Sequence, residues 1–215
     1  MSCGIIATVA QILEAIGTIG ATVLALVLAL FGRQVAERRF GPKLELKLHD
    51  PQGDLIERPD KKQTKARYYH VKVINTGRTA AKRVKVRIVR LDRKQPDGSW
   101  SQEKRYVIPV QLQWAYSLVW PPAEQFQASL PTIWTDDDYY CDLAYLNEGE
   151  QRVVIPSYEN PTNFPGHVTE GNPVRVHLIA SAENCRSKSP LVVEISWDGK
   201  WSADGDEMQK YLVVG

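Results

Sequence analysis

The stretch that decides the fold is YHVKVINTGRTAAKRVKVRI, residues 69–88. Apolar and polar side chains alternate at residues 69–73 and again at residues 84–88, where valine and isoleucine alternate with lysine and arginine. A period of two is that of a β-strand with one face buried in a core. The intervening Asn75-Thr76-Gly77 consists of residues typical of turns. The stretch therefore predicts strand, turn and strand.

The same signals recur on both sides of this stretch. Leucines at 44, 46 and 48 alternate with charged residues, and Asp97-Gly98 is a strong hairpin signal between the strand at 84–88 and one near 106–108. Further strands are expected at residues 125–130, 139–146, 152–155, 174–180 and 191–197. Many short strands, with no amphipathic helix of useful length after Gln34, predict a mainly β domain, an antiparallel immunoglobulin-like β-sandwich.

Residues 69–86 also carry a family resemblance. Their order of strand, Asn-x-Gly turn, alanine and strand resembles that of bacterial immunoglobulin-like sandwich modules of the CARDB type. The whole layout is similar to small bacterial proteins with one N-terminal helix and such a domain. The resemblance implies a sandwich fold and carries over no catalytic residues, and domains of this type are often extracellular.

The N-terminal segment predicts a transmembrane helix that precedes the sandwich. Between Gly4 and Gly32 the strongly polar residues are Gln11 and Glu14, and residues 15–31 carry no charge. A helix over residues 5–31 is roughly 40 Å long, against about 30 Å of hydrocarbon. A cleaved signal peptide would begin with positive charge, and the first four residues have none. The expected organisation is tail and helix at 1–34, basic juxtamembrane linker at 35–42 and β-sandwich at 43–215.

Flanking charge predicts the orientation of this helix. No lysine or arginine precedes it, and five basic residues follow it closely: Arg33, Arg38, Arg39, Lys43 and Lys47. The positive-inside rule places the basic side in the cytoplasm. We expect a single-pass protein of the inner (cell) membrane, with its N-terminus outside and its β-domain cytoplasmic.

The helix also contains a stripe of small residues. Glycine or alanine recurs every four residues at Gly17, Ala21, Ala25 and Ala29, and Glu14 lies on roughly the same face. Small side chains permit close approach of helices in lipid, and neighbouring copies would shield an ionisable group. These five residues are the predicted interface of a homo-oligomer, although such a spacing also arises by chance.

A concentration of basic residues marks the predicted strands. Between Lys61 and Lys94 there are thirteen basic residues and one acid, Asp92. Anionic lipid headgroups attract each such residue by about 1 kcal/mol near the surface. Nucleic acid is not the expected partner, because few aromatic residues accompany the basic ones. The predicted basic surface comprises Lys82, Lys85, Arg87 and Arg90, and an ordinary solvated face is the alternative.

The six tryptophans include a pair, Trp114 and Trp120, that flanks an apolar stretch. Exposed aromatic residues favour recognition, so the pair is a candidate binding surface, with core packing as the alternative. The cysteines form no CxxC pair, and Cys141 and Cys185 would bridge only in an oxidising compartment. The motifs of common hydrolases, nucleotide-binding proteins and zinc enzymes are absent, so neither enzymatic activity nor a metal or cofactor is expected.

Three functional hypotheses remain open at this point. The first is a membrane-anchored interaction module whose sandwich binds a protein or an anionic surface at the inner membrane face. The second is an oligomerising membrane effector or sensor of a bacterial stress or antiviral defence system. The third is an extracytoplasmic ligand-binding domain, which requires the opposite orientation.

Overall fold

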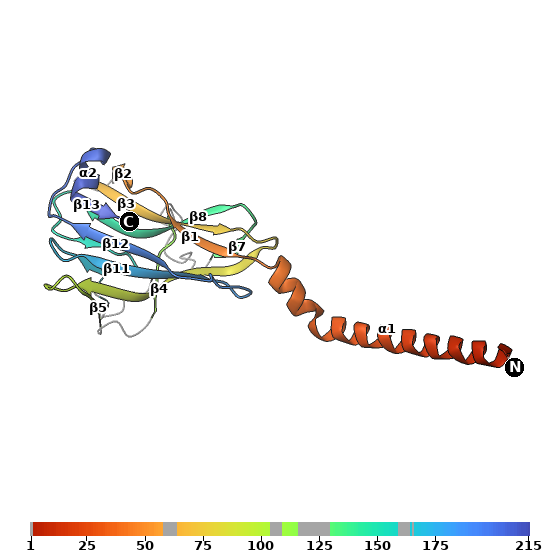
Figure 1. Ribbon diagram of the computed structural model, residues 1–215. Coiled ribbons are helices and arrows are strands. Elements are labelled where there is room, and N and C mark those ends of the chain that lie inside the picture. Colours follow the sequence, from red (N-terminus) through yellow and green to blue (C-terminus); the bar gives the residue numbers. More distant parts are fainter. Residues whose placement is uncertain (1, 58–63, 104–108, 116–129, 159–163, 165) are drawn as a thin grey trace. The chain divides into compact units, whose positions relative to one another are not determined.

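The computed structural model describes residues 2–57, 64–103, 109–115, 130–158, 164 and 166–215. The chain divides into two compact units, Met1–Gly41 and Pro42–Gly215. The first is a helix, and the second contains two antiparallel sheets (Figure 1). The prediction of a mainly β fold, a β-sandwich preceded by one helix, is confirmed.

Helix α1 (Ser2–Phe40) is continuous and long. Its segment Glu14–Gly32 is entirely unburied within this structure and is long and apolar enough to cross a membrane. The helix ends at Phe40, so most of residues 35–42, predicted as a basic juxtamembrane linker, are helical. Residues 34–40 contain no proline or glycine, whereas Gly41 and Pro42 follow immediately and end the helix.

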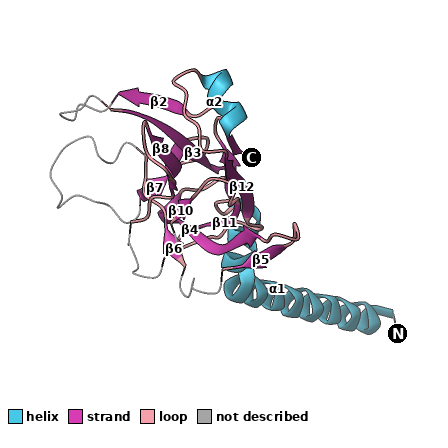
Figure 2. Ribbon diagram, turned by 90° about the vertical axis from the view of Figure 1, so that its left-hand side faces the viewer, coloured by secondary structure: helices cyan, strands magenta, loops and turns pink. Residues whose placement is uncertain are grey.

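The sandwich consists of two sheets that we name after their central strands. The β3 sheet contains, in order, β1 (Leu44–Leu48), β3 (Lys65–Asn75), β8 (Asp138–Asn147), β9 (Val153–Val154) and β10 (His167–Val168), with β2 (Asp54–Glu57) also on β3. The β4 sheet contains, in order, β13 (Leu212–Val214), β12 (Leu191–Trp197), β11 (Val174–Ser181), β4 (Ala81–Lys94) and β5 (Trp100–Gln102), while β6 (Val110–Gln111) and β7 (Leu130–Ile133) pair with other parts of β4. The short helix α2 (Gly205–Tyr211) precedes β13 and lies near β2 (Figure 2).

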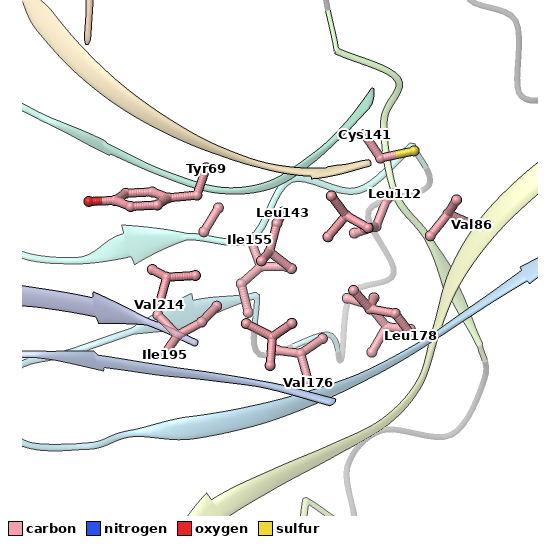
Figure 3. Packing of buried hydrophobic residues seen from close by; sticks show 14 of the residues in the cluster. Tyr69, Val86, Leu112, Cys141, Leu143, Ile155, Val176, Leu178, Ile195 and Val214 are labelled. Carbon is pink, nitrogen blue, oxygen red and sulfur yellow. The ribbon is translucent and has the colours of Figure 1, made fainter. Parts of the chain in front are cut away.

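The core lies between the two sheets and follows the alternation in the sequence (Figure 3). Leu143 of β8 is fully buried there with Val176 and Leu178 of β11. Val86 of β4 is 1% exposed, and Cys141 is fully buried. Each buried aliphatic side chain contributes about 1.5–3 kcal/mol relative to exposure. Tyr69, Val71 and Val73 of β3 are fully buried, as are Val84 and Ile88 of β4, so the two strands predicted at 69–73 and 84–88 and their buried faces are confirmed.

The turn predicted at Asn75-Thr76-Gly77 depends on side-chain hydrogen bonds and not on a left-handed backbone. Neither Asn75 nor Gly77 has a positive φ. Instead the buried Asn75 side chain accepts from the backbone N–H of Lys43 and Gly77 and donates to the carbonyls of Thr79 and Ile133. These bonds fix a crossing between sheets, because β3 and β4 belong to different ones.

The sequence pattern did not predict several of the shorter strands or the short helix α2. Asp97-Gly98 does form a hairpin, with Gly98 at φ +83°, but its second strand is β5 at 100–102. The strand expected near 106–108, and all but the last residue of the one expected at 125–130, lie outside the described residues. The unpredicted elements are β2, β5, β6, β10, β13 and α2, and most of them are too short to show a period.

A matched pair of glycine substitutions tests the packing at the β2 end of the sandwich. Gly53 has φ +66°, and a Cβ there would lie 2.7 Å from the Tyr68 carbonyl oxygen and 2.9 Å from the Tyr69 ring. Gly98 has φ +83° with open space around it. We expect Gly98→Ala to cost about 1–2 kcal/mol for the left-handed backbone. Gly53→Ala should cost about 1–3 kcal/mol more through overpacking.

Urea unfolding of the two variants, followed by tryptophan fluorescence, measures this difference. Equal losses of stability would show that Tyr68 and Tyr69 do not crowd residue 53.

Candidate ligand cleft and basic face

One row of directly paired residues crosses the outer face of the β3 sheet. Asp54 pairs with Tyr68, Tyr68 with Tyr145, Tyr145 with Val154, and Val154 with His167. Directly paired residues of neighbouring strands point to the same side of a sheet. Tyr69, Ala144, Val153 and Val168 are fully buried in the core, and each is next along its strand to a member of the row, so Tyr68, Tyr145, Val154 and His167 point outward. The two tyrosine rings stack with centroids 5.1 Å apart.

His70 lies beside this row between two carboxylates. Its Nδ1 is 3.0 Å from Asp142 Oδ1, and its Nε2 is 3.2 Å from Asp54 Oδ2. The imidazole is 3% exposed and stacks on the ring of Tyr68. Each ring nitrogen therefore lies within ion-pair distance of a carboxylate, Nδ1 of one from β8 and Nε2 of one from β2. The sequence pattern placed His70 in a strand and gave it no role.

A cleft of about 570 Å³ opens over the row. Its volume is within the range of small-molecule sites. The backbone N–H of Asp142 donates to the Gln113 carbonyl, and the Gln113 side chain donates to the Ser157 carbonyl. These bonds fix one wall of the cleft to the sheet. The lining residues are Tyr68, Gln113, Asp142, Tyr145, Arg152, Val154, Ile155, Pro156, Ser157, Tyr158, Phe164, Gly166 and His167.

One part of the cleft lining carries the positive charge of Arg152. Arg152 is exposed, and no ion pair joins it to an acid among the described residues. Burial lowers the pKa of His167, and the positive charges of Arg93 and Arg152 lower it further. His167 is therefore neutral at neutral pH and can donate and accept hydrogen bonds. A second hollow, of about 570 Å³, shares Arg152 and His167 with the cleft.

The predicted basic surface lies on β4, and part of it is neutralised. Arg90 Nε is 2.7 Å from Asp92 Oδ1, and His177 Nε2 is 2.9 Å from Asp92 Oδ2. Burial raises the pKa of Asp92, but hydrogen bonds from Arg90 and His177 outweigh it and hold that pKa below its ordinary value. Ion pairs also join Arg83 to Glu183, Arg93 to Glu103 and Arg175 to Glu194.

The other three residues of the predicted basic surface are not neutralised in this way. Lys82, Lys85 and Arg87 make no ion pair within the described part of the chain. Lys85 and Arg87 alternate with the buried Val86 and Ile88, so they share the outer face of β4. The wider basic run of the sequence is divided between the sheets, and its Arg67 is only 3% exposed.

The proposed aromatic surface at Trp114 and Trp120 needs correction. Trp114 is 6% exposed and packs in the core, and its backbone bridges to that of Cys141. Trp120 lies outside the described residues. Trp134, which sequence reasoning did not select, is 64% exposed. Both Cys141 and Cys185 are free thiols, and burial raises the pKa of each.

The small-residue stripe of α1 lies on an unbroken helix. Glu14, Gly17, Ala21, Ala25 and Ala29 are all exposed, and spacings of three and four residues place them on one side. The oligomer that the stripe predicts stays a prediction.

These features define a class: a two-sheet antiparallel sandwich preceded by one helix able to cross a membrane. No family model and no curated protein matches the chain. Among solved structures, the X-ray structure of a Northeast Structural Genomics Consortium target is 13% identical with a TM-score of 0.29, over 79% of this chain and 95% of that one.

Within the described residues, no group of three His, Cys, Asp or Glu side chains is placed to hold a metal ion.

Proposed function

We propose that this chain is a single-pass bacterial inner-membrane protein whose sandwich is a non-enzymatic interaction module. The segment Glu14–Gly32 supplies the anchor. The basic residues that follow it favour an outside N-terminus and a cytoplasmic sandwich. In that orientation the sandwich faces the anionic lipids of the cytoplasmic leaflet.

The pattern of ion pairs on the β4 sheet is the reason for our choice of binding surface. Four arginines of the β4 sheet pair with acids, whereas Lys82, Lys85 and Arg87, all in the first half of β4, have no such pair among the described residues. A positive charge that its own fold leaves uncompensated is available to an external anion. The module accordingly binds anionic headgroups through this basic face, defined as Lys82, Lys85 and Arg87.

The released domain, Pro42–Gly215, should bind vesicles that contain phosphatidylserine and should not bind pure phosphatidylcholine vesicles. Replacing Lys82, Lys85 and Arg87 together by glutamine removes about 3 kcal/mol of attraction, at about 1 kcal/mol per residue. The vesicle partition coefficient should fall about 100-fold in a flotation assay. Raising the salt concentration should weaken the binding of the unmodified domain as well.

The matched control removes the same number of charges from paired positions. Arg83, Arg93 and Arg175, replaced together by glutamine, also lower the net charge by three, but each of them already faces a glutamate. This variant should lose much less binding than the first. Equal losses in the two variants would show that net charge alone, and not the basic face, drives the association.

A second candidate function is an oligomerising membrane effector or sensor of a bacterial stress or antiviral system. The observation that favours it is the stripe of Gly17, Ala21, Ala25 and Ala29 on a helix unbroken from Ser2 to Phe40. The third, an extracytoplasmic ligand-binding domain, draws support from the cleft over the β3 sheet.

A further inference from the structure

The cleft over the β3 sheet offers aromatic ring surface in its floor. Tyr68 and Tyr145 stand side by side on neighbouring strands, and Phe164 and Tyr158 add further rings to the lining. The C–H face of a sugar ring is apolar and packs well on an aromatic ring, which has an apolar body. A wholly apolar ligand would leave the polar groups of the lining without partners, at a cost in affinity.

Those polar groups are held in place before any ligand arrives. Asp142 directs Oδ1 toward His70, and its second oxygen, Oδ2, has acceptor capacity left. Gln113 donates its side-chain N–H to the Ser157 carbonyl, which fixes the amide and leaves its oxygen as an acceptor. Two fixed acceptors beside aromatic rings suit a ligand rich in hydroxyl donors.

Arg152 and His167 set a second requirement for a ligand of the cleft. The register places Arg152 and Asp142 on opposite sides of the Tyr145–Val154 pair along the strands. Arg152 offers a guanidinium fork that suits carboxylate and phosphate oxygens. The neutral His167 beside it supplies one more donor. A ligand in the cleft therefore meets acceptors on one side and an anion-binding arginine on the other.

From these observations we propose that the cleft binds an anionic sugar, a hydroxylated ring that carries a phosphate or a carboxylate. The ring lies on Tyr145, its hydroxyl groups donate to Asp142 and Gln113, and its anionic group binds Arg152 and His167. The site lies on the β3 sheet and uses none of the residues of the basic face on β4. Its test is therefore independent of the vesicle experiment.

The test uses the full chain in phosphatidylcholine nanodiscs, which contain no sugar headgroup. Hexose 6-phosphates and hexuronates of the gluco, galacto and manno series are titrated calorimetrically, each beside its uncharged hexose and inorganic phosphate. At least one anionic sugar should bind about tenfold or more tightly than its uncharged hexose and than phosphate alone. Preference for the phosphate or the uronate series identifies which anionic group the site selects.

Variants connect the binding to the named residues. Arg152→Gln should weaken binding of the anionic sugar about tenfold and leave that of the neutral hexose unchanged, because it removes a charge-assisted hydrogen bond. Tyr145→Ala should weaken both ligands, and Tyr145→Phe, which keeps the ring, should restore them. Arg83→Gln, the same charge change on the other sheet, should have no effect.

Two results would overturn the proposal. One is that none of the anionic sugars binds better than its uncharged hexose. The other is that Arg152→Gln and Arg83→Gln give the same affinity. Because Arg152 is exposed and makes no ion pair within the described residues, its substitution should leave the unfolding temperature unchanged, which excludes misfolding as the cause of any loss.

Discussion

Replacing Leu24 and Val27 by arginine is expected to remove the chain from the membrane fraction. Both residues lie inside the span Glu14–Gly32, and both are exposed. An arginine at the centre of a membrane helix costs about 2.5–3.5 kcal/mol on insertion scales. Two of them cost about 5–7 kcal/mol, enough to reverse the equilibrium between inserted and free chains.

Alkaline carbonate extraction measures this effect, because it releases peripheral proteins and leaves integral ones in the pellet. The unmodified chain should stay in the pellet and the double variant should be released. Arginines at Gln34 and Val35, beyond the end of the span, make the same charge change and should leave insertion intact. A double variant of Leu24 and Val27 that still resists extraction would refute the assignment of α1 as a membrane anchor.

The second large effect is expected at Arg67, whose guanidinium ties one end of the sandwich together. Its Nη1 donates to the carbonyls of Gln52 and Gly53 at 2.9 and 3.0 Å, and its Nη2 donates to that of Ala203 at 2.6 Å. The side chain is 3% exposed. Arg67→Met would keep most of the volume and remove these donors. At about 1 kcal/mol for each hydrogen bond lost, the loss is about 3 kcal/mol.

Thermal unfolding of the full chain in detergent, followed by near-ultraviolet circular dichroism, should show a midpoint lower by about 6–12 °C. Arg67→Lys should recover little of this, because an ammonium group cannot reproduce the planar fork. Lys47→Met is the surface control. Lys47 is 62% exposed and 3.9 Å from Glu45, an ion pair expected to contribute less than about 1 kcal/mol. An Arg67→Met midpoint equal to that of the control would show that the three hydrogen bonds do not hold the fold.

The candidate sites show that a sequence pattern predicts which face of a strand a residue lies on, but not its contacts with other strands. Lys85 and Arg87 were placed correctly on one face of a strand, because their alternation with Val86 is a local property. Arg90 and its partner Asp92 also belong to one strand, whereas the ion pair of Asp92 with His177 could not be predicted, because it depends on β11 lying beside β4. Trp114 gave no signal that separates a core tryptophan from an exposed one.

The cleft could not be predicted from the sequence either, because it also depends on the pairing of strands. Tyr68, Tyr145 and His167 of its lining are far apart in the chain, and each resembles an ordinary strand residue. They come together because β3, β8, β9 and β10 are neighbours in the sheet, in that order, and the register of their pairings aligns these residues. A single sequence contains no direct signal for such a register.

The sequence by itself determined the apolar helix, the principal strands and the faces that those strands bury. These properties depend on residues within one or two turns of helix or a few positions of strand, so composition and period are sufficient. The tertiary structure alone decided that β3 and β4 belong to different sheets, that Arg67 is internal, and that a cleft forms over Tyr68 and Tyr145. The physical reason is that hydrogen-bonded pairing and burial join residues distant in the chain, whose proximity no local pattern specifies.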